Sequence, residues 1–469
     1  IDHVLFWDPV AALGIDAGTD VPLVVIWLIA GALFFTIRMK FINIRAFGHA
    51  INLVRGRYDK PENKGEVSHF QALATALSAT VGLGNIAGVA IAISLGGPGA
   101  TFWMILAGFL GMSSKFVECT LGVKYREIDE HGEVAGGPMY YLSKTLKKRN
   151  LAVLGKVLAF IFAILVIGAS LGGGNMFQSN QAFKQFATMM PFMEDKGFYF
   201  GLLLAVLVGL VIIGGIRSIA RVTGKIVPFM AILYVLAALL IIFMNFSAID
   251  DVFGLIFREA FTGTAIKGGF IGVMIQGFRR AAFSNEAGVG SASIAHAAAK
   301  TNEPISEGIV ALLEPFIDTV VICTMTALVL IFTGFHNNPT GLEGAPLTSA
   351  AFGSVFSWFP FVLMIAIFLF AFSTMISWSY YGLKGFNYLM KPLIPNKKLS
   401  SYIYNFIFLL FIIIGSSSDM GAVIEFSDMM ILGMAFPNIF GLYFLVKEVK
   451  TDLKDYFRRL KSGEIKKFK

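Results

Sequence analysis

Residues that could bind an ion or a zwitterion lie together in the middle of an apolar stretch. Ser78 and Asn85 stand on either side of Gly82 and Gly84 in the sequence SATVGLGNIAGV, which begins at Ser78. A glycine in a helix costs about 1 kcal/mol relative to alanine, and short polar side chains compete for the backbone hydrogen bonds. We therefore predict two half-helices that meet at an unwound joint. Free carbonyl groups of the first half can bind a cation, and free N–H groups of the second half can bind an anion.

The same glycines allow two simpler interpretations. Small residues are common where membrane helices pack closely, so Gly82 and Gly84 could serve only as a helix contact. The run from Gly82 to Ala87 also matches the loose dinucleotide-binding pattern GxGxxA. We disfavour a dinucleotide site because apolar segments of membrane-spanning length flank the run, where that fold needs a soluble strand and helix.

The composition is that of a polytopic membrane protein. Hydrophobic residues make up 56% of the 469 residues, charged residues make up 14%, and the mean hydropathy is +0.73. Because the apolar segments are spread over the whole length, we predict a single multi-pass domain, 1–469, in the cell (plasma) membrane. The net charge of +8 does not indicate nucleic-acid binding, since the Lys and Arg residues lie in short loops. Cys119 and Cys323 fall in predicted spans and do not indicate a disulfide framework.

We predict an all-α protein with about eleven transmembrane helices. Every cluster of Lys and Arg falls on one side of this arrangement, so the positive-inside rule places the N-terminus outside and the C-terminus in the cytoplasm. The predicted spans are approximately residues 21–37, 70–95, 100–125, 151–186, 198–213, 226–246, 262–298, 306–332, 348–389, 403–414 and 420–446.

The segment 262–298 is too long and too polar for an ordinary span, and we predict that it is a second broken helix. The sequence NIAGV at residues 85–89 recurs as NEAGV at residues 285–289, 200 positions later. Five spans separate the copies, so the second copy runs in the opposite direction. Broken helices at equivalent places in two inverted halves indicate a transporter's binding site. The predicted parts are an extra N-terminal helix (21–40), two inverted repeats of five helices (68–246 and 262–448) and a cytoplasmic tail (449–469).

Several motifs carry a resemblance to a known family. They are FSNEAGVGSASIAHAAA from Phe283, GGPMYYL from Gly136, NMFQ from Asn175 and FIDTVVICTMTAL from Phe316. Together they strongly resemble the sodium:alanine symporter family, the alanine or glycine:cation symporters, over residues of about 60 to 440. That family is similar in fold to the LeuT-type transporters of the amino acid–polyamine–cation superfamily, which implies a LeuT-like core of five plus five helices.

The resemblance implies a sodium site between the first broken helix and the ninth span. The carbonyl groups of Ser78 and Val81 would face the ion from the joint, and the hydroxyl groups of Ser373 and Thr374, with the Phe370 carbonyl one turn earlier, would complete the site. Hard cations are bound by such oxygens. The alternative is that these hydroxyl groups only bond to the backbone of their own helix.

The candidate substrate site is the other side of the same joint. The resemblance implies that the Leu83 and Gly84 amides face a substrate carboxylate. Amide side chains can also bind an amino acid, or can simply join two helices. Aromatic side chains could limit the space for the substrate side chain. The full set of candidates is Thr80, Leu83, Gly84, Asn85, Gln178, Gln276, Phe278 and Trp378.

Ionisable residues within the spans are costly in lipid and need partners. We predict a pair between Lys115 and Glu118, which are three positions apart on one helix. We also predict an inner-gate network of Arg279, Arg280 and Glu286. His296 is expected to be structural. Candidate proton sites, among which the sequence does not choose, are Glu314, Asp318, Glu425 and Asp428.

We conclude from the sequence that the chain is a secondary active symporter for sodium and a small neutral amino acid, alanine or glycine. Its expected partners are these two solutes and the lipid bilayer, with no nucleic acid and no particular oligomeric state indicated. The alternative is a proton-coupled or channel-like amino-acid permease. An enzyme is disfavoured because the chain has 6 His, two isolated Cys and no metal-binding spacing such as HExxH.

Overall fold

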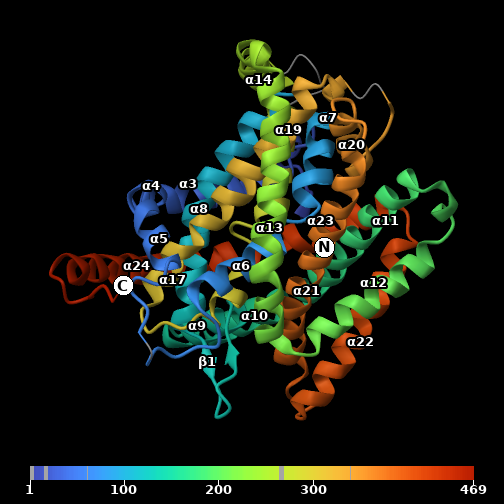
Figure 1. The fold of residues 1–469 in the computed structure, drawn as a ribbon. Helices are drawn as coiled ribbons and strands as arrows, with labels where there is room; N and C mark the ends of the chain where they lie inside the picture. The colour runs from blue at the N-terminus through green and yellow to red at the C-terminus, as the bar shows by residue number, and fades with distance from the viewer. Residues whose placement is uncertain (1–4, 15–18, 61, 263–268, 338–339, 469) are drawn as a thin grey trace.

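The computed structural model describes residues 5–14, 19–60, 62–262, 269–337 and 340–468. These residues form a bundle of helices, with one short antiparallel hairpin of β1 (Glu127–Ile128) and β2 (Val134–Ala135) (Figure 1). The helices that build the bundle are α3 (Leu23–Arg38), α6 (His69–Thr80), α7 (Val89–Gly96), α8 (Ala100–Lys124), α10 (Ala152–Leu171), α11 (Phe177–Met189), α12 (Gly197–Ile212), α13 (Gly215–Met244), α15 (Gly269–Asn285), α16 (Ala292–His296), α17 (Pro304–Ala311), α19 (Thr324–Phe332), α21 (Phe359–Met390), α22 (Lys397–Ser416), α23 (Met420–Gly433) and α24 (Ala435–Lys461). The other α-helices are α2 (Pro9–Ala12), α4 (Ile42–Arg45), α5 (Phe47–Val54), α9 (Pro138–Lys148), α14 (Ile249–Thr262), α18 (Leu313–Pro315) and α20 (Ala345–Gly353).

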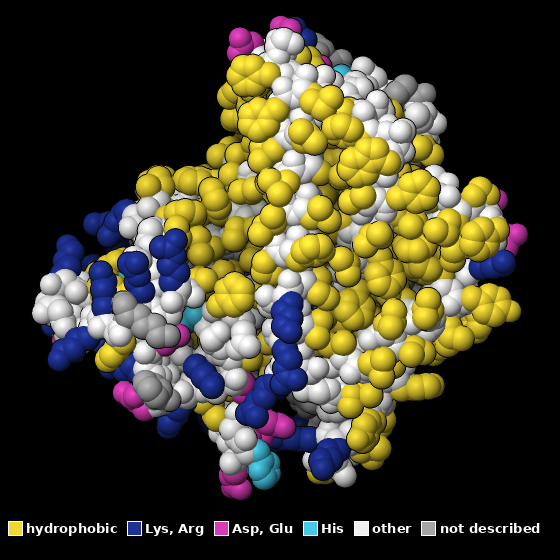
Figure 2. All heavy atoms as spheres, viewed as in Figure 1, with side chains coloured by type: hydrophobic (Ala, Val, Ile, Leu, Met, Phe, Trp, Pro, Cys, Tyr) yellow, Lys and Arg dark blue, Asp and Glu magenta, His cyan; other side chains and the backbone are white. Residues whose placement is uncertain are grey.

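The described helices are consistent with the predicted eleven spans. Seven are long and apolar enough to cross a membrane, and the pair α6 and α7 counts as one further, bent span. The apolar helices α3 and α12 are shorter, and α15 with α16 forms the remaining segment. Large apolar side chains of α12, α13 and α22 face outward, among them Leu210, Leu236 and Phe406. They cover a broad face of the molecule (Figure 2), as expected for a surface in contact with lipid.

The first predicted break is confirmed. The helix α6 begins at a capping box in which Ser68 and Gln71 satisfy each other's backbone groups, and it ends at Thr80. A wider π-helical turn, η1 (Gly84–Gly88), then leads into α7. The two halves are bent by 50°. The N–H groups of Gly82 and Leu83 therefore lie outside regular helical bonding, in the middle of a buried segment, and donate to the side chains of Asn85 and Gln178.

The second predicted break is also confirmed. The helix α15 ends at Asn285, and α16 begins only at Ala292. Between them the backbone turns through left-handed conformations at Glu286 (φ 55°), Gly288 (φ 86°) and Gly290 (φ 92°). Glycine adopts such angles without steric cost, which explains how the chain can leave the helix here. Residues 263–268 of the predicted span lie outside the described residues.

The structure adds detail to three of the predicted segments. The ninth predicted span, 348–389, is two helices, α20 and α21, because Pro360 near the start of α21 cannot continue a helix from before it. The predicted tail is helical as far as Lys461, since α24 continues beyond the predicted span. The fourth span contains a π-helical turn, η2 (Gly172–Met176), between α10 and α11.

The two broken helices lie against each other. The chain entering α6 pairs with the chain leaving α16: the Glu66 amide donates to the Ala298 carbonyl (2.8 Å) and the Lys300 amide donates to the Val67 carbonyl (2.7 Å). At the breaks, a Cβ on Gly84 would lie 3.5 Å from Cα of Ser284. These residues are 200 positions apart, the offset of the sequence repeat. Contact between equivalent residues is expected close to the axis that relates two inverted repeats.

Candidate functional site

The end of α6 and the middle of α21 bring together the predicted cation ligands. The Thr374 hydroxyl lies 2.9 Å from the Ser78 carbonyl oxygen, and the Ser78 hydroxyl donates to the Ser373 carbonyl at 2.6 Å. The Ser373 hydroxyl lies 3.0 Å from the Phe370 carbonyl. All four residues are buried, and Val81 follows directly at the C-terminus of α6. The Ser373 hydroxyl bonds to a carbonyl of its own helix, as the alternative interpretation expected. The Thr374 hydroxyl does not, because its hydrogen bond runs from α21 to α6.

This donor set fits a small hard cation. It consists of carbonyl and hydroxyl oxygens at a point where a helix ends inside the protein, which is the chemistry expected of a sodium site. Among the described residues, no group of three or more His, Cys, Asp or Glu side chains is placed to hold a metal ion. Assignment of Ser78, Val81, Phe370, Ser373 and Thr374 as ligands stays a prediction.

Gly82 is the tightest position of the joint. A Cβ added there would lie 2.3 Å from the Thr374 hydroxyl oxygen and 3.1 Å from Oε1 of Gln178. At Gly84, in contrast, a Cβ would make only ordinary contacts of 3.5 Å and longer. Close packing of α21 against the joint therefore requires glycine at position 82. The predicted role of Gly84, whose amide would face the substrate carboxylate, is a separate prediction.

The predicted free amides are not all free. The Leu83 N–H donates to Oε1 of Gln178 at 3.0 Å, and the Asn85 N–H donates to the Gly82 carbonyl at 3.2 Å. The other end of the Gln178 side chain donates to the Gly173 carbonyl in η2 (2.8 Å). Gln178 thus places an amide oxygen where a substrate carboxylate oxygen was predicted. A carboxylate could bind the Leu83 amide only if this side chain moved away.

Asn85 is tied to a buried carboxylate rather than facing open space. Its Nδ2 donates to Oδ1 of Asp318 at 2.6 Å, and its Oδ1 accepts from the Gly82 N–H at 2.9 Å. The Ser284 hydroxyl, from the second broken helix, donates to Oδ2 of the same carboxylate (2.9 Å), as does Thr319 (2.7 Å). Asp318 lies in a π-helical segment, η5 (Phe316–Cys323), between α18 and α19. This one carboxylate therefore holds both breaks together.

Three of the predicted substrate residues lie away from the joint's inner surface. The Thr80 hydroxyl bonds back to the Ala76 carbonyl of its own helix at 3.2 Å. Gln276 lies against Gly96 at the far end of α7. Phe278 lines a small cavity shared with Leu28 of α3 and with α8. The difference arises from the rotation of α15, which turns Phe283 and Ser284, not Gln276 or Phe278, toward Gly84.

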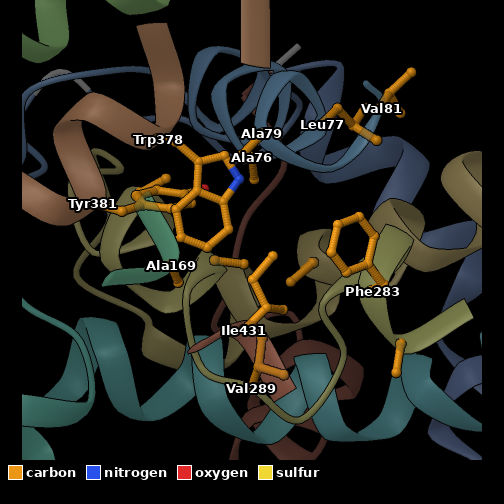
Figure 3. Close-up of a cluster of buried hydrophobic side chains, with 14 of the residues drawn as sticks. Ala76, Leu77, Ala79, Val81, Ala169, Phe283, Val289, Trp378, Tyr381 and Ile431 are labelled. Atoms are coloured by element: carbon orange, nitrogen blue, oxygen red, sulfur yellow. The ribbon is translucent and has the colours of Figure 1, made fainter. Parts of the chain in front are cut away.

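An apolar wall stands beside the joint (Figure 3). Trp378 of α21 is 1% exposed, and its ring lies so close to Gly174 that a Cβ there would be 2.2 Å from Cγ of the indole. Ile431 of α23 and Phe283 of α15 belong to the same buried cluster, near Leu77 of α6. The role of Trp378 in limiting the space for the substrate stays a prediction, and Phe283 and Ile431, which belong to the same wall, were not among the predicted residues. Large apolar residues are so frequent in this chain that the sequence offered no signal to select them.

The predicted Lys115–Glu118 pair is wrong. The Lys115 ammonium lies 2.9 Å from Oε1 of Glu314, which belongs to α18, and both side chains are fully buried. Glu118 instead accepts a hydrogen bond from Nδ2 of Asn438 at 2.9 Å. His296 lies 3.6 Å from the other oxygen of Glu314, so the predicted structural histidine joins the same cluster.

The predicted network of Arg279, Arg280 and Glu286 is also wrong. Both arginines bind Asp428 of α23, Arg279 at 2.8 Å and Arg280 at 2.5 Å. Glu286 instead accepts a hydrogen bond from Ser291, within the second break. The arginines therefore connect α15 to α23, whereas the Glu286 side chain is bound within the break.

Comparisons with known proteins agree with the fold. A profile of the sodium:alanine symporter family matches residues 14–469. The chain is 42% identical over 448 residues to "Sodium/alanine symporter AgcS" of Methanococcus maripaludis, covering 95% of this chain and 96% of that protein. It is 36% identical over 445 residues to "Probable sodium/glutamine symporter GlnT" of Bacillus subtilis, covering 94% of this chain and 89% of that one.

A solved structure shares the architecture. The crystal structure of MhsT in complex with L-phenylalanine superposes with a TM-score of 0.57 at 12% identity, covering 83% of this chain and 98% of that chain. At this identity the likeness concerns the fold alone, and it confirms the predicted LeuT-like arrangement. From the family profile and the relatives, the chain belongs to the sodium:alanine symporter family, a family of integral membrane transporters rather than enzymes.

Proposed function

We propose that this protein takes up alanine or glycine together with sodium, by alternating access, across the plasma membrane. In this proposal the N-terminus is outside and the C-terminus is cytoplasmic, in agreement with the distribution of Lys and Arg. The observation that supports the proposal best is the contact between the Thr374 hydroxyl and the Ser78 carbonyl. It joins a cation-binding donor set to the helix break beside which an amino acid would bind.

The geometry suggests how the two solutes would be coupled. Sodium would be held by the carbonyl oxygens of Ser78 and Val81 together with oxygens of Phe370, Ser373 and Thr374 on α21. The substrate carboxylate would be held by the amides of Leu83 and Gly84. A carboxylate in a buried site costs several kcal/mol unless donors or positive charge meet it. A sodium ion close by would supply positive charge, and each solute would strengthen the binding of the other by the same factor.

Gln178 would occupy the position of a substrate carboxylate oxygen until the substrate binds. Its Oε1 accepts a hydrogen bond from the Leu83 N–H, which would otherwise be a buried donor without an acceptor. Substrate binding would replace one acceptor with another that carries a full negative charge. The buried side chains of Trp378, Phe283 and Ile431 would limit the space for the substrate side chain, which would favour alanine and glycine over larger amino acids.

The test is uptake of labelled alanine into vesicles reconstituted with the purified protein. We expect concentrative uptake that needs an inward sodium gradient and stops when that gradient is collapsed. Thr374→Ala should raise the sodium concentration for half-maximal uptake by about tenfold or more, the effect of losing one ligand of a buried ion. The alanine requirement at saturating sodium should change much less. Uptake that persists without any gradient would indicate the channel-like alternative.

Proton coupling is the second candidate, and one observation favours it. A chain of ionisable groups leads inward from Asp59, whose side chain is 42% exposed, to His69 at 3.8 Å. His69 contacts Glu307, which lies 2.6 Å from Nδ1 of His296. The chain then continues through Glu314 to Lys115. Such a chain could carry protons between the protein surface and the core.

Vesicles that contain a pH-sensitive dye separate the two candidates. For a sodium symporter, alanine uptake with sodium present should cause no change in internal pH beyond that of empty vesicles. Acidification that follows alanine addition without sodium, and that is lost in His296→Gln, would favour the proton-coupled permease. A size-exclusion profile of purified His296→Gln shows whether that variant still folds.

A further inference from the structure

A positively charged cavity lies between the inner end of the first span and the C-terminal helix. It has a volume of about 320 Å³. Seven of its ten lining residues are Lys or Arg, and none of the ten is Asp or Glu. The remaining three, Met39, Leu453 and Phe457, form an apolar part of the lining. A concave site with strong positive charge and an apolar surface suits a ligand that is both anionic and amphipathic.

One wall is the corner between α3 and α4. Arg38 ends α3, and Lys40 and Arg45 follow on the turn and on α4. Lys40 and Phe41 both have left-handed backbone angles, φ 55° and φ 54°, which side-chain-bearing residues rarely adopt. Such disfavoured backbone is retained mainly where it positions functional groups. Here the turn buries Met39 and leaves Phe41 48% exposed on the outside of the corner.

The other wall is one face of α24. Its basic residues Lys450, Lys454, Arg458 and Lys461 line the cavity and are spaced four, four and three positions apart, so they share one side of the helix. Arg458 also binds Asp455 at 2.6 Å. The positive charge of Arg38, with Lys454 and Lys40, lowers the pKa of Lys450 below its usual range. These basic groups therefore repel one another, and an anion between them would be attracted by all of them.

The position of the cavity points to the membrane surface. The side chains next to the basic corner that face outward are apolar: Ile37 is 65% exposed and Ile44 is 61% exposed. Lys and Arg side chains gather around the same part of the molecule, near α4, α5 and the C-terminal part of α24 (Figures 1 and 2). Apolar residues directly beside a basic cavity are typical of the boundary between acyl chains and headgroups.

We propose that this cavity binds the phosphate of an anionic membrane phospholipid, such as phosphatidylglycerol or cardiolipin. The phosphodiester would lie between the α3–α4 corner and α24, where guanidinium groups can contact two phosphate oxygens at once. The glycerol and upper acyl chain would pack against Met39, Leu453 and Phe457. Bound in this way, a lipid would join the first span to the last helix, α24, which continues α23 and its Asp428 contact with α15.

The experiment compares lipid retention by three forms of the purified, full-length protein. They are the unaltered chain, the double variant Lys450→Gln/Lys454→Gln, and the control Lys391→Gln/Lys398→Gln, which removes the same charge from another basic loop. Each is released from mixed phosphatidylglycerol and phosphatidylcholine vesicles into mild detergent, and bound lipid is counted by native mass spectrometry. Size-exclusion profiles confirm that each form is folded.

We expect the unaltered chain and the control to retain phosphatidylglycerol in preference to phosphatidylcholine. The double variant should lose about tenfold or more of this retention, since each basic residue near a membrane surface attracts anionic lipid appreciably. Equal loss in the control would show a general effect of surface charge and would overturn the proposal. A final arm adds millimolar inorganic phosphate: lipid that stays bound supports a phospholipid site, whereas displacement would show a site for free phosphate and overturn it.

Discussion

Replacement of Gly82 by alanine tests whether the joint and α21 form the sodium site. The new Cβ would lie 2.3 Å from the Thr374 hydroxyl oxygen, where ordinary contacts are 3.4 Å or longer. The hydroxyl must therefore move by about 1 Å, or α21 must shift. Overpacking of this kind costs about 1–3 kcal/mol. If that cost falls on the ion-bound state, sodium affinity drops by a factor of about 5 to 150, since 1.4 kcal/mol corresponds to tenfold.

The experiment measures sodium binding in the absence of any amino acid. Binding is monitored as the rise in Tm of the purified protein when sodium is added. We expect Gly82→Ala to need about tenfold more sodium for half of the rise. The matched control is Gly88→Ala, in the same motif, where an added Cβ meets no atom within 4 Å. It should respond like the unaltered chain.

A double variant shows whether the effect acts through the hydroxyl. If the clash with the Thr374 hydroxyl is the cause, Gly82→Ala/Thr374→Ala should bind sodium little more weakly than Thr374→Ala alone, because the closest atom, at 2.3 Å, is gone. Fully additive losses, or equal responses of Gly82→Ala and Gly88→Ala, would refute the assignment of this site.

Three further outcomes follow from the site and the buried charges. Trp378→Ala should increase leucine uptake relative to alanine uptake, a ratio that does not depend on the amount of folded protein, and an unchanged ratio would remove Trp378 from the substrate wall. Alanine amide, which lacks the carboxylate, should compete for binding far more weakly than alanine, and equal competition would contradict a carboxylate at the Leu83 amide. Lys115→Met should lower unfolding stability by about 3–5 kcal/mol because it leaves Glu314 buried without its partner. Lys115→Met/Glu314→Gln should recover much of this loss in a thermal unfolding assay, and no recovery would argue against the pair.

The sequence was sufficient for features that depend on neighbouring residues along the chain. The break at Gly82 and Gly84 follows from glycine's low helix propensity, and the turn at Gly288 and Gly290 from its freedom to adopt positive φ. The apolar lengths predicted the spans, and the repeat 200 positions apart identified the two segments that the structure brings together. These properties are local or periodic, so they can be seen without knowledge of the packing.

Tertiary structure alone decided which side chains meet. Lys115 and Glu118 lie three positions apart on one helix, yet the ammonium group binds Glu314, 199 positions away, because that carboxylate lies across the helix interface. The sequence likewise could not show that Gln178 would accept a hydrogen bond from the Leu83 N–H, or that Asp318 would accept hydrogen bonds from both breaks. Such partners depend on how far each helix is rotated about its axis. In a chain with 46 Phe, hydrophobicity does not specify that rotation. Only the structure shows that Phe283, rather than Phe278, faces the joint.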